Sequence, residues 1–213
     1  MSWTMLLGSA FLIGLSGAMM PGPVLTYVVN GSLRKGFIAG PLIITGHALL
    51  ELLLVVLLLS GLSNLFASEL FTSLVGVIGG GFLLFMALGM VKSVVKKEVS
   101  LEEEMEEKSG GATGLILPGA LISISNPYWI LWWATVGITY LANSYQQGLL
   151  GTGVFFMGHI AADFAWYSLI AFVVSRGRKL INDRAYRGLI IFFGLVLMYF
   201  SGVFILDGIQ YFI

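Results

Sequence analysis

Six apolar stretches, each long enough to cross a lipid bilayer, constrain the fold of this chain more than any other feature. They cover residues 3–29, 37–62, 70–91, 114–141, 149–174 and 188–212. A transmembrane helix needs about 20 predominantly apolar residues, whereas the strands of a membrane β-barrel would alternate apolar and polar residues over about ten positions. Only 10% of the residues are charged, against about 25% in soluble domains. The sequence therefore predicts an all-α integral membrane protein with six transmembrane helices.

Basic residues stand in or beside only the first, third and fifth connections between these stretches. They are Arg34, Lys35, Lys92, Lys96, Lys97, Lys108, Arg176, Arg178, Lys179, Arg184 and Arg187. Both termini and the second and fourth connections contain no lysine or arginine. Because positively charged loops remain on the cytoplasmic side of a membrane, we expect cytoplasmic basic loops and both termini outside. The chain would be a multi-pass protein of the cytoplasmic membrane.

The chain also contains an internal repeat with an offset of 112 residues. With this offset, Gly46-His47 aligns with Gly158-His159, and Glu51 aligns with Asp163. Each unit would hold three helices, and because three is odd the two units would insert with opposite orientations. We therefore predict two inverted three-helix repeats, an arrangement found in many secondary transporters.

The repeat divides the chain into three regions. Residues 1–92 would form the first three-helix repeat and residues 114–213 the second, and the two would make one transport domain. Residues 93–113 between them are rich in glutamate and lysine. We interpret this segment as a solvated, partly helical cytoplasmic linker, with a regulatory or partner-binding role as the alternative.

The two histidines of the chain, His47 and His159, each stand four residues before a carboxylate, Glu51 and Asp163. Positions i and i+4 share one face of a helix, so each pair places an imidazole beside an acid. A charged side chain at the centre of a spanning helix costs about 2.5–3.5 kcal/mol, which makes these pairs the first candidates for function. The acids could carry protons, hold the ammonium group of a substrate, or neutralise the histidines as structural pairs.

The same four residues allow other chemistry. The histidines could tune or relay protons, because imidazole titrates near neutral pH. If His47, Glu51, His159 and Asp163 met across the two repeats, they would also suit zinc, manganese or iron. Export of a divalent cation and an intramembrane enzyme are therefore the alternatives to proton-coupled transport. No Walker-type phosphate loop occurs in the chain, so ATP-driven pumping has no support, and we expect no cofactor.

Prolines interrupt the first apolar stretch of each repeat. Pro21-Gly22-Pro23 lies in the first stretch and Asn126-Pro127 in the fourth. Proline removes a backbone donor and blocks the preceding helical turn, so both helices should break. Broken membrane helices can aim their positive N-terminal ends at a substrate. We therefore expect Pro21, Gly22, Pro23, Asn126 and Pro127 to shape a central cavity, although prolines also bend membrane helices without any role in binding.

Three tryptophans, Trp129, Trp132 and Trp133, follow the second break. They lie deeper than the interfacial belt in which tryptophan usually gathers. Trp129 and Trp133 could line the pathway as a gate or as a cation-binding wall. Ordinary packing against lipid or neighbouring helices is the alternative.

Several of these motifs resemble the lysine/homoserine exporter (LysE/RhtB) family of amino-acid efflux proteins. The motifs are Pro21-Gly22-Pro23, Arg34-Lys35-Gly36, Gly46 with Glu51, Gly81-Phe82-Leu83 with Gly89 and Lys92, and Asn126-Pro127. The resemblance implies six helices and the export of amino acids or related metabolites, driven by an ion gradient. Two features depart from the family pattern: Tyr128-Trp129 follows the Asn-Pro pair where a lysine is common, and the two histidines are not part of it.

Together these observations predict a secondary transporter that exports an amino acid or a similar small metabolite through the lipid bilayer. The coupling ion would be a proton or another cation, exchanged in the opposite direction. Glycines spaced four apart, Gly36 with Gly40 and Gly76 with Gly80, let helices approach closely and could serve internal packing or a homodimer. We expect no nucleic-acid partner.

Overall fold

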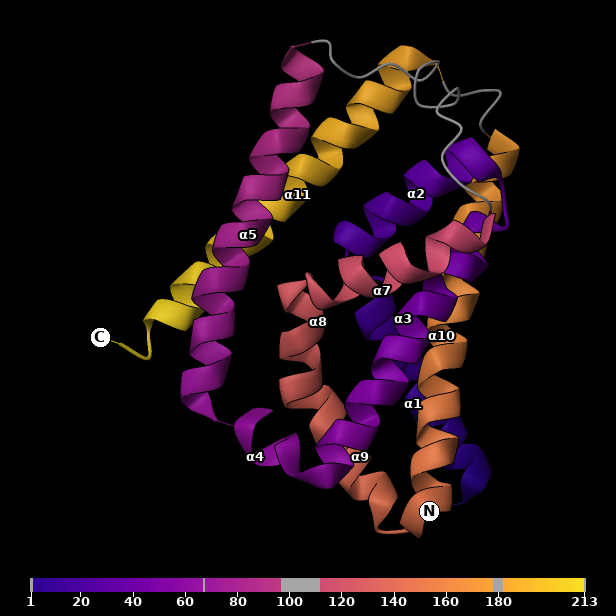
Figure 1. Cartoon of the computed structure of the whole chain (residues 1–213), viewed down its shortest axis with the longest axis vertical. Coiled ribbons are helices and arrows are strands. Elements are labelled where there is room, and N and C mark those ends of the chain that lie inside the picture. The colour runs from indigo at the N-terminus through magenta and orange to yellow at the C-terminus, as the bar shows by residue number, and fades with distance from the viewer. Residues whose placement is uncertain (1, 67, 97–111, 178–181, 213) are drawn as a thin grey trace.

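The computed structural model describes residues 2–66, 68–96, 112–177 and 182–212 (Figure 1). Every regular element in these ranges is a helix, which confirms the all-α prediction. Most of the segment interpreted as a charged linker, residues 97–111, lies outside the described residues, as do Lys97, Lys108, Arg178 and Lys179. The elements are α1 (Trp3–Ala18), α2 (Pro23–Lys35), α3 (Ala39–Leu57), η1 (Leu58–Leu62), α4 (Ser63–Phe66), α5 (Glu69–Val95), η2 (Ala112–Leu115), α7 (Ile116–Ile124), α8 (Pro127–Trp132), η3 (Trp133–Gly137), α9 (Ile138–Tyr145), α10 (Gly148–Gly177) and α11 (Asp183–Ile209).

Four helical stretches are individually long and apolar enough to cross a membrane. They are Ala39–Phe66, Glu69–Val95, Gly148–Gly177 and Asp183–Ile209. The pair α1 and α2 passes the same test as one bent span, which makes five among the described residues. The chain is thus a multi-pass membrane protein.

The first break separates α1 from α2, whose axes differ by 81°. Helix α1 ends at Ala18, and α2 begins at Pro23, with Gly22 in an extended conformation before it. Proline is well suited to the first turn of a helix because the amide it lacks would have no intrahelical partner there. The proline pair therefore ends one helix and starts the next.

The second break divides the fourth predicted span into short elements. Helix α7 ends at Ile124, and α8 begins at Pro127. Asn126 caps α8, because its side-chain Oδ1 accepts a hydrogen bond of 3.2 Å from the amide of Tyr128. A π-helical turn, η3, then leads into α9. No single helix here is long enough to count as a span, so the sixth span remains a prediction.

Two helix pairs each join a helix from the first half of the chain to one from the second half: α1 packs against α10, and α3 packs against α7 (Figure 1). We call this arrangement crosswise packing. Glycine makes both contacts close. A Cβ atom on Gly46 would collide with the backbone of Ile116 in α7, and one on Gly158 would lie 2.6 Å from the carbonyl oxygen of Leu7 in α1. The aligned glycines of the repeat thus face corresponding partners.

Helices α5 and α11 form a third pair, at one side of the molecule (Figure 1). The hydroxyl of Ser201 donates a hydrogen bond of 2.8 Å to the carbonyl of Gly80. A Cβ on Gly76 would lie 2.8 Å from the carbonyl oxygen of Phe204, and one on Gly40 would lie 2.8 Å from that of Tyr167. These glycines therefore serve contacts within the chain.

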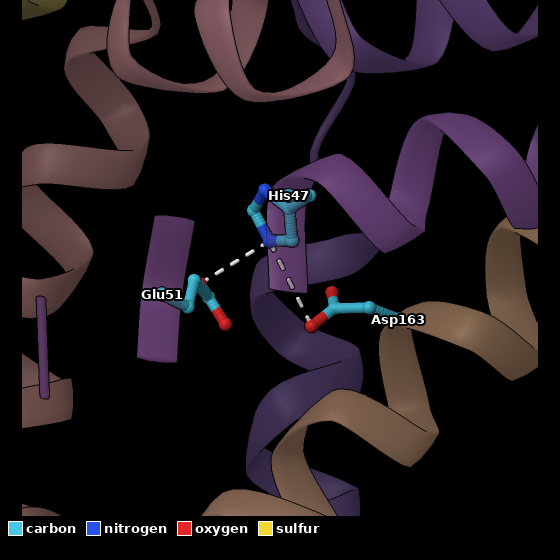
Figure 2. A group of neighbouring side chains, drawn as sticks. All are labelled: His47, Glu51 and Asp163. Carbon is cyan, nitrogen blue, oxygen red and sulfur yellow. Dashed lines mark ion pairs between the residues drawn. The ribbon is translucent and has the colours of Figure 1, made fainter. Parts of the chain in front are cut away.

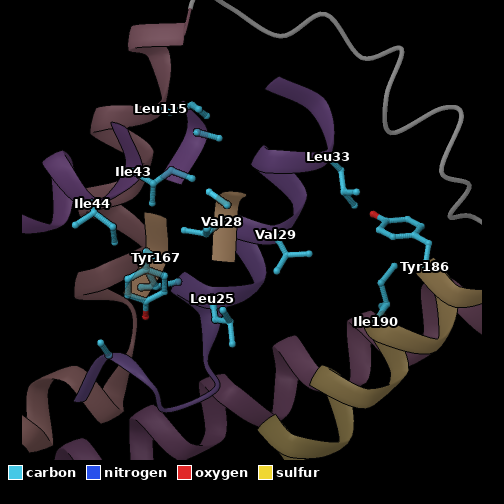
Figure 3. Packing of buried hydrophobic residues seen from close by; sticks show 14 residues of the cluster. Leu25, Val28, Val29, Leu33, Ile43, Ile44, Leu115, Tyr167, Tyr186 and Ile190 are labelled. Carbon is cyan, nitrogen blue, oxygen red and sulfur yellow. The ribbon is translucent and has the colours of Figure 1, made fainter. Parts of the chain in front are cut away.

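Two apolar clusters enclose the centre of the bundle. One, shown in Figure 3, includes Ile43 and Ile44 of α3 and Tyr167 of α10, and extends to Tyr186 of α11. The other contains Leu54 of α3, Phe155 of α10 and the tryptophans of α8 and η3. On both α3 and α10, the histidine and the acid fall between residues of the first cluster and residues of the second. The ionisable side chains are therefore flanked by apolar residues on two sides.

Candidate functional site

The two histidine–carboxylate pairs meet in the structure, and we call His47, Glu51, His159 and Asp163 the quartet. Nε2 of His159 lies 3.0 Å from Oε2 of Glu51, and Nε2 of His47 lies 3.9 Å from Oδ2 of Asp163. Within each helix, the corresponding distances are 3.2 Å in α3 and 3.6 Å in α10. All four residues are buried. Figure 2 shows the carboxylates of Glu51 and Asp163 both approaching the same ring nitrogen of His47, Nε2.

Glu51 is held by two indole groups. Its Oε1 accepts hydrogen bonds of 2.7 Å from Nε1 of Trp129 and 2.8 Å from Nε1 of Trp133. A carboxylate oxygen that accepts two N–H donors has no room for a proton of its own. A proton on Glu51 would therefore sit on Oε2, the oxygen that faces His159.

The ring of His47 is oriented by Ser123 of α7. The Ser123 hydroxyl donates its hydrogen to the carbonyl of Gly119 at 2.7 Å, and its oxygen lies 2.8 Å from Nδ1 of His47. The carbonyl can only accept, so both bonds are made at once only when Nδ1 of His47 is protonated and donates to the Ser123 oxygen. This assignment leaves Nε2 as the nitrogen that gains or loses a proton, on the side of Glu51 and Asp163.

His159 is surrounded by aromatic rings. It stacks on Trp132 with a centroid distance of 4.7 Å and on Phe155 at 6.1 Å, and Trp133 meets its edge at 5.5 Å. An imidazolium over an indole face is favourable, so these rings accommodate both the neutral and the charged form. Neither ring nitrogen has an aligned hydrogen-bond partner among the described residues, despite the short approach to Glu51.

The quartet borders a small chamber of about 30 Å³. Its other lining residues are Gly17, Ala18, Val24, Asn126, Tyr128, Trp129, Trp132 and Tyr167. A water molecule needs about 10–15 Å³ of such space, whereas pockets for metabolites occupy about 300–1,000 Å³. In this conformation the chamber fits protons, water or a single ion, and an amino acid is too large for it.

The two helix breaks approach one another beside this chamber. A Cβ on Gly22 would lie 3.5 Å from Nδ2 of Asn126, and Asn126 itself lines the chamber. Pro21, Pro23 and Pro127 do not line it; Pro23 and Pro127 are fully buried at the starts of α2 and α8. The prolines thus shape the chamber indirectly, because they set where α2 and α8 begin and in which direction these helices run.

Most of the other site residues predicted from the sequence lie at the chamber. His47, Glu51, His159, Asp163, Asn126 and Trp129 line the chamber, and Trp133 reaches it through its bond to Glu51. Sequence reasoning missed Ser123 and the lining role of Tyr167. Tyr167 stands four residues after Asp163, on the same helical face, and that spacing could have identified it. Ser123 carries no comparable signal.

A multi-pass helical bundle with broken helices and buried ionisable groups has the build of a membrane transporter. The LysE type translocator family model matches residues 15–208, and the chain therefore belongs to this family. The match includes both breaks and all four quartet residues, and it confirms the family resemblance noted from the motifs. No curated protein and no solved structure matches the chain. Family membership makes the protein a membrane translocator of a small molecule.

Proposed function

We propose that the protein is a secondary active exporter of amino acids or related small metabolites, driven by exchange for protons. The observation that carries this proposal is the quartet: four buried ionisable side chains from two helices, gathered where the two helix breaks approach each other. Ionisable residues inside a membrane protein are rare and mark ion or proton pathways.

The proposed architecture is a six-span inverted repeat, with units at residues 1–92 and 114–213 joined by the linker at 93–113. The crosswise packing supports it, because Gly46 contacts α7 while its repeat equivalent Gly158 contacts α1. The end of α5 and the start of α11 lie at the same end of the molecule, at the top of Figure 1. We place this basic end in the cytoplasm and both termini outside.

In the proposed mechanism the quartet loads and releases protons during the transport cycle. Oε2 of Glu51 and Nε2 of His159 are close enough to exchange a proton, and Nε2 of His47 lies 3.9 Å from Oδ2 of Asp163. A proton entering from outside would bind to the quartet and raise its charge by one, and release of the proton inside would restore the starting charge. Because the chamber is too small for a metabolite, substrate passage requires α3 and α10 to separate from the broken helices, as in alternating access.

The test is a flux assay with purified protein in proteoliposomes and a panel of labelled amino acids under an imposed pH gradient. The wild-type protein should move at least one amino acid against its gradient, and Glu51→Gln or Asp163→Asn should abolish gradient-driven flux. Glu69→Gln is the matched control, because Glu69 is an exposed carboxylate at the start of α5, away from the quartet. Full flux by both quartet variants, with correct insertion, would refute the proposed role of the acids.

Export of a divalent cation is the second candidate, and one observation favours it. Ligand atoms of His47, Glu51 and Asp163 all lie within 4.8 Å of one another. Imidazole and carboxylate ligands suit zinc, manganese or iron, and the bond from His47 to Ser123 is the kind of outer contact that orients a ligating histidine. In this case Zn²⁺ or Mn²⁺ should raise the melting temperature of the purified protein and compete in the flux assay. An unchanged melt with both ions would remove this candidate.

A further inference from the structure

A second cavity, of about 330 Å³, lies between α5, the α8–η3 segment and α11. It is lined by Thr72, Ser73, Gly76, Tyr128, Leu131, Trp132, Thr135, Val136, Phe204, Asp207 and Gly208. Its volume is about eleven times that of the chamber at the quartet, and it reaches the range of small-metabolite pockets, about 300–1,000 Å³. This cavity, unlike the chamber, has room for an amino acid.

Two aromatic side chains form a common wall between the cavity and the chamber. Tyr128 and Trp132 line both spaces. Trp132 stacks on His159 at 4.7 Å, and Tyr128 stacks on Phe204 at 6.2 Å. These two rings therefore stand between the cavity and the chamber.

The lining presents one negative charge, several hydroxyl groups and aromatic rings. Asp207 is its only ionisable acid, and no lysine, arginine or histidine lines the cavity. The hydroxyls of Thr72 and Thr135 donate to carbonyls of their own helices, so their oxygens are left as acceptors. Asp207 is exposed, and its carboxylate has no hydrogen bond or ion pair with any other residue that the structure describes.

These groups complement a cation that donates hydrogen bonds. A primary ammonium group carries one positive charge and three N–H donors, and it is attracted both to a carboxylate and to the faces of tryptophan and tyrosine. An anionic ligand would be repelled by Asp207, and a neutral ligand would gain no charge attraction from it. The lining therefore favours an amine.

We propose that this cavity binds the primary ammonium group of a small molecule, with Asp207 as its counterion and the Tyr128–Trp132 wall as its inner limit. That the bound amine is the exported metabolite rests on the proposed function, whereas the binding itself does not. The same ammonium chemistry is presented by a free amino acid and by the ethanolamine headgroup of a phospholipid. Binding measurements in nanodiscs of different lipids separate these two sources.

Binding is measured by calorimetric titration of the purified, full-length protein in detergent. Ethanolamine and L-alanine are the probes, and choline is the control because its quaternary ammonium has no N–H donor. Ethanolamine should bind more tightly than choline, and Asp207→Asn should weaken ethanolamine binding about tenfold or more. Glu69→Gln is the control, because Glu69 is an exposed carboxylate at the same end of α5 as Thr72 but does not line the cavity. It should leave the affinity unchanged.

Nanodisc measurements distinguish the source of the amine. If a lipid headgroup occupies the cavity, phosphatidylethanolamine nanodiscs should suppress ethanolamine binding relative to phosphatidylcholine nanodiscs, and L-alanine should not bind. If the site takes a free amino acid, L-alanine should bind in both lipids. Equal affinity of Asp207→Asn and wild type, or the absence of binding by every amine, would overturn the proposal.

A transport-deficient variant keeps this test independent of the proposed function. Glu51→Gln should still bind ethanolamine with wild-type affinity, because Glu51 does not line the cavity. Thr135→Val is a second variant of the cavity itself, which removes one hydrogen-bond acceptor and keeps the size of the side chain. Like Asp207→Asn, it should bind ethanolamine more weakly than wild type. Amine binding without any flux would remove the exporter proposal and leave the cavity assignment intact.

Discussion

Nε2 of His159 on α10 lies 3.0 Å from Oε2 of Glu51 on α3, so that an imidazole of one helix faces an acid of the other. Each histidine already has an acid one turn away in its own helix. The additional contact between helices joins two separate pairs into one buried group. A change of charge at any member must therefore affect both helices.

The indole bonds to Glu51 make a direct prediction. Trp133→Phe removes one N–H donor from a buried carboxylate while keeping an aromatic ring, and it should reduce stability by about 1.5–3 kcal/mol. Thermal melts of the purified protein would measure this change. Trp166→Phe is the matched control, because Nε1 of Trp166 has no hydrogen-bond partner among the described residues; an equal loss in both variants would assign the effect to packing.

Ser123 should control the tautomer of His47. In the wild-type protein, nitrogen NMR of labelled histidine should show the neutral His47 ring protonated at Nδ1, because the Ser123 oxygen accepts from that atom. Ser123→Ala should mix the two tautomers and slow proton-coupled flux. Ser125→Ala is a control, since the Ser125 hydroxyl donates to the carbonyl of Leu121, one turn earlier in the chain. A wild-type histidine spectrum in Ser123→Ala would contradict the assignment.

The crosswise helix contacts should tolerate no added methyl group. Gly46→Ala and Gly158→Ala would each place a Cβ against the backbone of the partner helix, and overpacking of this kind costs about 1–3 kcal/mol. Both variants should melt at a lower temperature than wild type. Gly153→Ala, on the same helix as Gly158 but with open space around its Cβ position, should melt like wild type, and a comparable loss there would disconnect the effect from these contacts.

The proposed orientation can be tested with single cysteines, because the natural chain has none. Gln146→Cys, between α9 and α10, should react with a membrane-impermeant maleimide in intact cells. Phe37→Cys, between α2 and α3, should react only after the membrane is permeabilised. Both positions are exposed in the structure. The reverse labelling pattern would place the basic loops outside.

Much of this structure follows from local features of the sequence. The helical spans follow from apolar length, and the breaks follow from Pro23 and Pro127, because proline acts on its own backbone. The meeting of His47 and Glu51 with His159 and Asp163 was suggested by the repeat, which relates distant positions by symmetry. Local patterns therefore account for the helices, and the repeat accounts for the identity of the quartet.

Other features depend on packing between distant segments and were not predictable. The bond between Ser123 and His47 joins residues 76 positions apart, and the bonds to Glu51 span 78 and 82 positions. The sequence offers no pattern that pairs these residues. The cavity beside Asp207 likewise arises from the crossing of α5 and α11 next to α8, and the acid itself stands near a helix end where a solvated carboxylate is ordinary.

The central claim is that the quartet couples protons to substrate movement. Proteoliposomes that trap a pH-sensitive dye would report proton flux when an outward gradient of a transported amino acid is imposed without any initial pH difference. The wild-type protein should drive protons in the direction opposite to the amino acid, and Glu51→Gln should abolish this proton movement. Amino-acid flux without proton movement in the wild type, or undiminished proton movement in Glu51→Gln, would contradict the account.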